Sequence, residues 1–166
     1  LDDLSRLDVA ELGRLYAHGA APANLAVLEG HPRGRMLSVR GLDHGVPGTL
    51  LRRLAGADAF PWGGKSFAGA GESGTGLNRV HLGGRHQLFP FLTSLRPSVV
   101  DRAPCVVLDY DLADNPGFIR AIHDEVRAIE PGLFLGPAML KAATGPKLVL
   151  WFALDTRVQA AAIGQP

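Results

Sequence analysis

Apolar residues recur with a helical period near the start of the chain and with a strand-like period from about residue 60. Three of them share one face of a helix: Val9, Leu12 and Tyr16. Asp8 and Glu11 have the spacing of a capping box, and Gly19 is a residue type that ends helices. We therefore predict a helix over 8–18 that packs on the outside of something larger, and a second short helix over 46–57.

Short apolar segments bounded by turn residues indicate antiparallel strands in the remainder of the chain. They cover residues 77–82, 87–92, 105–110 and 147–154. The first two flank Gly83-Gly84, a dipeptide typical of hairpin turns. A two-residue loop would pair Val80 with Gln87, whereas a three-residue loop would pair Val80 with Leu88. We expect the second register, because it keeps the apolar residues on one face.

The segment after Pro116 fits two interpretations. Its apolar residues have helical spacing, but Glu130–Leu133 (Glu-Pro-Gly-Leu) suits a type II turn, which takes proline second and glycine third. We interpret the segment as one helical turn followed by a hairpin of 124–129 with 133–141. A helix over 124–130 remains the alternative.

Two short helices followed by five or more antiparallel strands, with no alternating βαβ pattern, indicate a mainly β chain. The tight connections favour an antiparallel β-barrel or a strongly curved sheet. The length of 166 residues fits a single domain over 1–166. We expect a helical N-terminal segment over 1–57 and the barrel over 58–158.

Charge balance and cysteine content exclude several classes of protein. With 17 basic and 16 acidic residues the net charge is +1, which leaves no basic excess to neutralise nucleic-acid phosphates. Cys105 is the only cysteine, which excludes a disulfide within the chain. No apolar run approaches the roughly 20 residues that span a bilayer, and we expect a cytoplasmic protein. No two of the six histidines have the helical spacing of a zinc site, and we expect neither metal nor cofactor.

Residues 69–76 match the G-x-G-x-x-G fingerprint of nucleotide-binding loops. That fingerprint requires a helix after the loop, but residues 77–82 alternate like a strand. A P-loop also requires a lysine before its Ser or Thr, and Thr75 and Gly76 stand there instead. We therefore expect a mobile glycine-rich loop at the mouth of a site rather than a nucleotide-binding loop.

Asp109 is the carboxylate that the sequence most strongly indicates as a functional group. It follows three apolar residues, so we expect the strand to draw it inward, with Tyr110 on the opposite face. A buried carboxylate is costly unless it is paired, and the candidate partners are Arg120, Arg127 and Lys65. Such a pair either closes the barrel structurally or orients a ligand or substrate.

Further polar and aromatic residues extend this candidate site. Glu125 and Arg127 share a strand face in the predicted hairpin, where Gly136 opposite Arg127 leaves room for the guanidinium to fold inward. His81 lies beside the first hairpin turn, as either a solvated residue or a general base at a cavity. Aromatic residues on or beside the strands fill the core or line a cavity. They are Trp62, Phe67, Phe89, Phe91, Phe134, Trp151 and Phe152.

Three parts of the chain resemble lipocalin-like domains of the GXWXG kind. They are Gly34-Arg35-Met36-Leu37 with Pro61-Trp62-Gly63-Gly64-Lys65-Ser66-Phe67, then Leu108-Asp109-Tyr110-Asp111 with Asn115-Pro116-Gly117-Phe118-Ile119-Arg120, and Gly132-Leu133-Phe134-Leu135-Gly136. The first contains the W-x-G-K-x-F pattern, although no glycine stands two residues before Trp62. The resemblance spans about residues 30–155 and implies a calycin-type β-barrel, in a family where small hydrophobic ligands are usual and catalysis is occasional. It implies no particular catalytic residue.

The sequence therefore predicts a calycin-like barrel that binds a small, mostly apolar molecule in a cavity of about 300 Å³ or more, with Asp109 on its wall. The expected ligand-binding residues are Lys65, Tyr110, Arg120, Glu125, Arg127, Phe134 and Trp151. The alternative is a cofactor-independent isomerase, cyclase or dehydratase, with Asp109 or His81 as base and Arg127 or Lys65 stabilising an oxyanion. A third class, a structural or interaction module, would have a filled barrel.

Overall fold

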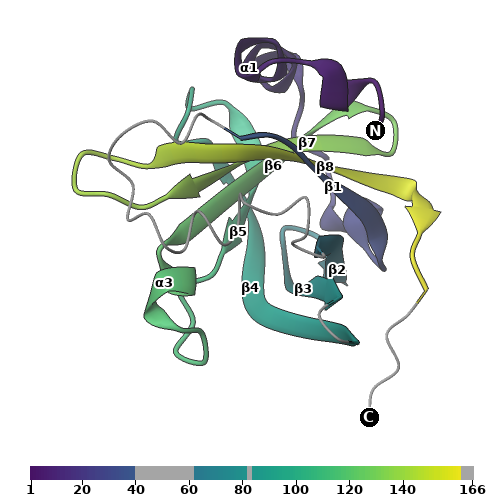
Figure 1. Cartoon of the computed structure of the whole chain (residues 1–166), viewed down its shortest axis with the longest axis vertical. Helices are drawn as coiled ribbons and strands as arrows, with labels where there is room; N and C mark the ends of the chain where they lie inside the picture. Colours follow the sequence, from purple (N-terminus) through teal and green to yellow (C-terminus); the bar gives the residue numbers. More distant parts are fainter. Residues whose placement is uncertain (40–61, 82–83, 162–166) are drawn as a thin grey trace.

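Eight antiparallel strands close into a barrel in the computed structural model, which describes residues 1–39, 62–81 and 84–161 (Figure 1). Each strand is hydrogen-bonded to the next along the chain, and the last pairs with the first. The strands are β1 (Pro32–Val39), β2 (Trp62–Ala70), β3 (Ser73–His81), β4 (Arg85–Pro97), β5 (Pro104–Asp109), β6 (Ile122–Glu130), β7 (Leu133–Leu140) and β8 (Lys147–Gln159). The predicted mainly β fold with an antiparallel barrel is confirmed.

Short helical segments precede and interrupt the strands. They are η1 (Leu4–Arg6), α1 (Val9–His18), η2 (Leu25–Leu28) and α3 (Gly117–Arg120). The capping box of α1 is complete, because Asp8 accepts from the Glu11 amide at 2.8 Å and its own amide donates to Glu11 at 2.9 Å. The helix predicted over 8–18 and the helical turn after Pro116 are therefore confirmed. The helix predicted over 46–57 lies outside the described residues.

The barrel begins at β1, within the segment that the sequence analysis treated as helical. Because β1 pairs with both β2 and β8, the expected boundary at residue 58 is wrong. The hydrophobic pattern of β1 is weak, because a glycine, Gly34, stands where an apolar side chain would be expected to face the barrel interior. A side chain at Gly34 would collide with the Gly64 backbone and the Trp62 ring, so close strand packing explains the missing signal.

The glycine-rich segment 69–76 forms the turn end of the β2–β3 hairpin, which corrects the expectation of a mobile loop at the mouth of a site. Gly69 pairs with Gly74, and the turn contains Gly71 at a φ of +72°. A Cβ atom on Gly69 would lie 2.5 Å from the Gly74 Cα atom, so the two strands approach too closely for side chains. Strand β3 follows the turn where a nucleotide-binding loop would require a helix. The structure therefore agrees with the argument against a nucleotide-binding loop.

Two predicted pairings differ from the observed ones. Val80 lies opposite His86 instead of Leu88, in one register with His81 opposite Arg85. Farther from the turn the register shifts between Gly76 and Asn78, where Phe89 of β4 has a positive φ of 57°. Pro90 follows, and proline cannot donate to a strand ladder. In the β6–β7 hairpin the turn at Glu130–Leu133 is confirmed.

The β6–β7 register differs by one residue from the prediction, although the strand interpretation of 124–130 is confirmed. The register shifts between Ala128 and Glu130, so Arg127 lies opposite Leu135 and not opposite Gly136. A Cβ atom on Gly136 would collide with the Glu125 backbone, so this glycine serves close packing of the strands.

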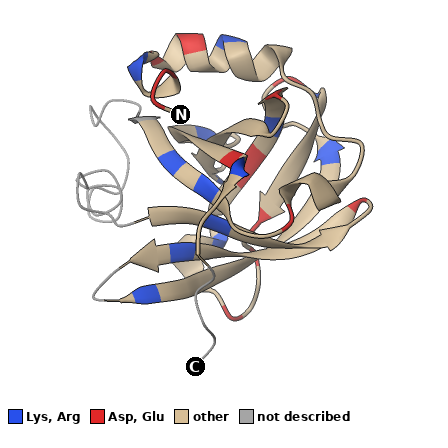
Figure 2. Ribbon diagram, turned by 90° about the vertical axis from the view of Figure 1, so that its right-hand side faces the viewer, with Lys and Arg blue, Asp and Glu red and all other residues tan. Residues whose placement is uncertain are grey.

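Side-chain alternation divides the apolar residues into an inner cluster within the barrel and an outer cluster beneath α1. Leu12 and Tyr16 of α1 belong to the outer cluster, and Figure 2 shows this helix lying along the outside of the barrel. The outer cluster consists of Leu4, Leu12, Tyr16, Leu133, Leu135, Trp151 and Ala153. The inner cluster includes Phe91, Val106, Leu108, Tyr110, Val126, Phe134, Leu150, Phe152 and Leu154. Because both faces of β7 and β8 are covered, their sequences are almost continuously apolar.

Candidate functional site

A cavity of about 110 Å³ lies inside the barrel. Twelve of its sixteen lining residues have apolar side chains, apart from the indole N–H of Trp62. They are Met36, Trp62, Val80, Phe89, Ile119, Ile122, Ala138, Met139, Leu140, Val149, Leu150 and Phe152. The others are Lys65, Asn78, Tyr110 and Asp124. The cavity is smaller than the expected 300 Å³ and is closer to an apolar cavity of ~150 Å³ that holds benzene in another protein.

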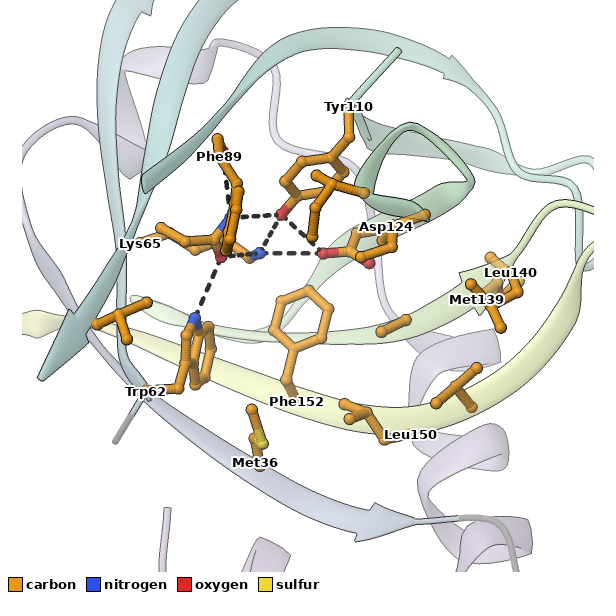
Figure 3. Close-up of a pocket in the computed structure, with 16 residues that line it drawn as sticks. Met36, Trp62, Lys65, Phe89, Tyr110, Asp124, Met139, Leu140, Leu150 and Phe152 are labelled. Carbon is orange, nitrogen blue, oxygen red and sulfur yellow. Dashed lines mark hydrogen bonds and ion pairs between the residues drawn. The ribbon is translucent and has the colours of Figure 1, made fainter. Parts of the chain in front are cut away.

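Four polar side chains from different strands meet on one wall of this cavity, and we call them the Lys65 cluster (Figure 3). They are Lys65 from β2, Asn78 from β3, Tyr110 at the end of β5 and Asp124 from β6. The Lys65 Nζ atom donates to Asp124 Oδ2 at 3.0 Å, to Asn78 Oδ1 at 3.0 Å and to the Tyr110 hydroxyl at 2.5 Å. All three donors of the ammonium group are therefore used.

The remaining groups of the Lys65 cluster also pair with one another. The Tyr110 hydroxyl donates to Asp124 Oδ2 at 3.1 Å, and the Asn78 amide donates to that hydroxyl and to the Phe89 carbonyl. Asn78 Oδ1 also accepts from the Trp62 indole at 3.1 Å. The exception is Asp124 Oδ1, which is buried and has no hydrogen-bond partner among the residues that the structure describes.

Burial controls the protonation of the cluster. Lys65 is 3% exposed, and aromatic rings surround its ammonium at 5.0 to 5.5 Å from their centroids. Burial lowers the pKa of Lys65, while the Asp124 carboxylate opposes that shift. Burial, followed by the charge of Asp124, raises the pKa of Tyr110 well above its ordinary value. Lys65 and Asp124 form an ion pair at 3.0 Å, and the phenol of Tyr110 keeps its proton.

A bulge in β2 explains how Lys65 and Trp62 both reach the cavity. Residues three apart on a regular strand face opposite sides of the sheet. In β2 the register shifts between Trp62 and Gly64, which pair with Val80 and Arg79, so one extra residue restores a common face. Gly64 adopts a φ of +110°, where a Cβ atom would lie 2.6 Å from the Gly34 nitrogen. Gly64 is therefore a structural requirement of this bulge.

Glu125 is held on the outer side of the barrel, beneath α1. Its carboxylate accepts from the Tyr16 hydroxyl at 2.6 Å, the Ser98 hydroxyl at 2.5 Å and the Val99 amide at 2.8 Å, and it pairs with His123 at 3.0 Å. Burial acts to raise the pKa of Glu125, but these hydrogen bonds together lower it to about 2. The network links α1 and the residues after β4 to the barrel wall.

Arg127 lies on the same outer face. Its guanidinium forms a bidentate ion pair with Asp101, at 2.6 and 2.7 Å, and donates to the backbone carbonyls of Ala103, Pro104 and Tyr16. The guanidinium therefore folds away from the cavity, because alternation along β6 turns Asp124 and Val126 inward instead. Glu125 and Arg127 share a face as expected, but that face is the outer one.

Asp109 also lies away from the cavity wall, which corrects the expectation that it turns inward. Its side chain is 38% exposed and pairs with Lys141 at 3.2 Å, so none of the three expected partners holds it. Val106 and Leu108 face the barrel interior, and alternation therefore turns Asp109 outward and Tyr110 inward. The sequence analysis placed Asp109 and Tyr110 on opposite faces correctly but exchanged the faces.

The structure brings two of the predicted site residues, Lys65 and Tyr110, to the cavity wall. Arg120 pairs with Asp111 at 2.7 Å on the surface, and His81 is an exposed residue at the end of β3. Phe134 belongs to the inner cluster away from the cavity wall, and Trp151 belongs to the outer cluster. The catalytic roles of Asp109 and His81 and the ligand-binding roles of the residues away from the wall remain predictions.

The sequence analysis missed Asp124 and Asn78. Asp124 is two residues before Val126, so the strand interpretation of this segment already placed the two side chains on one face. Asn78 is likewise two residues before Val80, and alternation along β3 places both side chains on the face that lines the cavity.

Two kinds of feature are absent from the described part of the chain. No group of three His, Cys, Asp or Glu side chains in it could hold a metal ion. Within the same residues, no helix is long and apolar enough to cross a membrane.

Comparison with known proteins assigns no family to the chain. No protein-family model matches it, and no curated protein matches it. A crystal structure of a protein from Thermomonospora curvata is similar, with a TM-score of 0.49 and 20% sequence identity over 90% of this chain and 87% of that chain. The fold and the site define a closed antiparallel β-barrel with a small apolar cavity and a buried ion pair.

Proposed function

We propose that the barrel binds a small, mostly apolar molecule in its cavity, with the Lys65 cluster as the polar end of the site. The apolar wall supplies the hydrophobic contribution to binding, and the cluster supplies orientation. The resemblance to GXWXG lipocalin-like domains supports the same proposal, because small hydrophobic ligands are usual in calycin-type barrels.

The observation that carries the proposal is a buried ion pair on the wall of an otherwise apolar cavity. Buried ion pairs contribute little net stability, and apolar residues of similar volume often serve a core equally well. Lys65 and Asp124 are 3% and 5% exposed as side chains, yet they lie beside unfilled space. A few polar groups converging in an apolar pocket are typical of ligand sites.

The cavity volume limits the size of the ligand. Pockets for drug-sized molecules occupy roughly 300 to 1,000 Å³, whereas this cavity occupies about 110 Å³. A single six-membered ring or a short alkyl chain matches that volume. Toluene is therefore a suitable first probe.

Thermal stability with and without toluene tests the proposal. Ligands that bind the folded state raise the melting temperature, so toluene is expected to stabilise the natural protein. Ala138→Leu fills the cavity from β7 and is expected to abolish that stabilisation. Ala142→Leu makes the same change at an exposed position and is expected to retain it. Equal stabilisation of all three proteins, or of none, would contradict the proposal.

One observation favours a second candidate, a cofactor-independent isomerase, cyclase or dehydratase. Asp124, Lys65 and Tyr110 place a potential base beside an ammonium group and a phenol on one wall of the cavity. In such an enzyme Asp124 would act as the base, in the role that the sequence analysis gave to Asp109 or His81. An Asp124→Asn variant that converts a bound compound at the natural rate would exclude this candidate.

A further inference from the structure

The hydrogen bonds of the Lys65 cluster leave one acceptor and no donor for a ligand, among the residues that the structure describes. Lys65 donates to three acceptors, and the Tyr110 hydroxyl and both Asn78 amide protons are also used. Asp124 Oδ2 accepts from Lys65 and Tyr110, whereas Asp124 Oδ1 accepts from neither. Figure 3 shows the dashed bonds converging on one of the two carboxylate oxygens.

An unpaired carboxylate oxygen is unusual in a protein interior, because a buried acceptor without a partner loses its hydrogen bonds to water. Asp124 is 3% exposed and is one of the residues that line the cavity. A ligand in this cavity therefore gains most from a group that donates a hydrogen bond to Asp124. A carbonyl, ether or carboxylate group would instead bring a second acceptor against it.

The donor of the ligand could be a hydroxyl or an ammonium group, and the positive charge of Lys65 favours the hydroxyl. Lys65 already neutralises Asp124 at 3.0 Å, and the four surrounding rings already contact the Lys65 ammonium. A ligand ammonium would add a second positive charge within a few ångströms of the first, in surroundings of low dielectric constant. A neutral hydroxyl avoids both the repulsion and the loss of ionic hydration.

We propose that the ligand is a neutral, hydroxyl-bearing apolar molecule of about the size of phenol, which donates its hydroxyl proton to Asp124 Oδ1. This inference rests on the proposed function, because it requires that the cavity takes a ligand. It assigns Asp124 as the residue that selects among ligands of equal size. Lys65 and Tyr110 act as positioning residues that hold the carboxylate.

Toluene and phenol test this inference, because they differ by a methyl group in place of a hydroxyl. In a wholly apolar cavity phenol binds more weakly than toluene, since its hydroxyl loses hydrogen bonds to water. With Asp124 as acceptor we expect the order to reverse, and phenol to bind about tenfold more tightly in calorimetric titrations. We also expect 1-butanol to bind more tightly than the isosteric butylammonium ion.

Variants locate the effect at the carboxylate. Lys65→Met with Asp124→Leu removes both charges together, which avoids an unpaired buried charge. This double variant is expected to bind toluene and to lose the preference for phenol. Asp109→Asn changes a half-exposed carboxylate away from the cavity and is expected to keep the natural preference.

Each outcome distinguishes the inference from the proposed function. Failure of the natural protein to bind either toluene or phenol would overturn both. Binding of toluene at least as tightly as phenol would overturn the hydroxyl assignment and leave the proposed function intact. A phenol preference that survives in the double variant would overturn the role of Asp124, and equal binding of butylammonium and 1-butanol would overturn the requirement for a neutral ligand.

Discussion

At the scale of single residues, the protein contains two Lys–Asp pairs that differ mainly in burial. Lys65 and Asp124 pair at 3.0 Å with side chains 3% and 5% exposed, whereas Lys141 and Asp109 pair at 3.2 Å with side chains 39% and 38% exposed. The first pair lies on the cavity wall and the second on the surface. The sequence pattern points to the wrong pair, because Asp109 follows the apolar residues of β5, whereas Asp124 lies among the charged residues of β6.

Removing the lysine of each pair is expected to have different effects on stability. Lys65→Met leaves Asp124 as an unpaired buried charge, at an expected cost of about 3–5 kcal/mol in the free energy of unfolding. Lys141→Met breaks an exposed pair and is expected to cost less than about 1 kcal/mol. Urea denaturation of both variants checks this difference. Equal costs would contradict the burial of the Lys65 cluster.

The Glu125 carboxylate predicts how stability depends on acidity. Its pKa is about 2 in the folded protein, below the ordinary glutamate value of 4.5. Between these values the unfolded chain binds a proton that the folded protein does not, so stability falls as the pH decreases from about 5 to about 2. The full effect corresponds to about 3 kcal/mol.

Unfolding measured across this pH range in two variants isolates the contribution of Glu125. Glu125→Gln is expected to flatten the dependence, because the amide does not titrate. Glu130→Gln, at an exposed position on the same strand, is expected to leave it unchanged. An unaltered slope in Glu125→Gln would show that other carboxylates cause the acid sensitivity.

At the scale of secondary-structure elements, glycine determines where β2 bends. Gly64 and Gly145 both have positive φ angles, of +110° and +99°. A Cβ atom on Gly64 would lie 2.6 Å from the Gly34 nitrogen and 2.7 Å from the Pro32 carbonyl oxygen, whereas one on Gly145 would meet nothing within 4 Å. A side chain at Gly145 would therefore cause backbone strain alone, whereas one at Gly64 would cause both backbone strain and a steric collision.

Alanine substitutions at these glycines are expected to differ in cost. Gly145→Ala introduces backbone strain alone and is expected to cost about 1–3 kcal/mol. Gly64→Ala adds a collision between β1 and β2 and is expected to cost more than that, and to weaken toluene binding by displacing Lys65. Denaturation and calorimetry of both variants test this. Similar costs would show that the bulge tolerates a side chain.

The elements were largely predictable from sequence, whereas the faces of the strands were not. The capping box of α1 and the turn at Glu130–Leu133 depend on a few neighbouring residues, and both are confirmed. The face of Asp109 depends on which side of β5 the barrel closes, which no local pattern encodes. The bulge in β2 and the irregularity at Phe89 likewise depend on neighbouring strands.

At the scale of the whole molecule, the protein has two apolar cores with different roles, one inside the barrel and one between the barrel and α1. The inner cluster surrounds the cavity and the Lys65 cluster. The outer cluster, together with the Glu125 and Arg127 networks, fixes α1 to the wall. Sequence analysis combined these polar groups into one site, because alternation shows which residues share a face but not which face is enclosed.

Methyl NMR spectroscopy during a titration with phenol tests ligand binding in the barrel most directly. The methyl groups of Ile119, Val149 and Leu150 line the cavity, and those of Leu12 and Leu135 lie in the outer cluster. The predicted result is a saturable shift of the cavity methyl resonances with one common dissociation constant, while the outer-cluster resonances stay unchanged. Unchanged cavity resonances at high phenol concentration, or shifts confined to the outer cluster, would contradict binding inside the barrel.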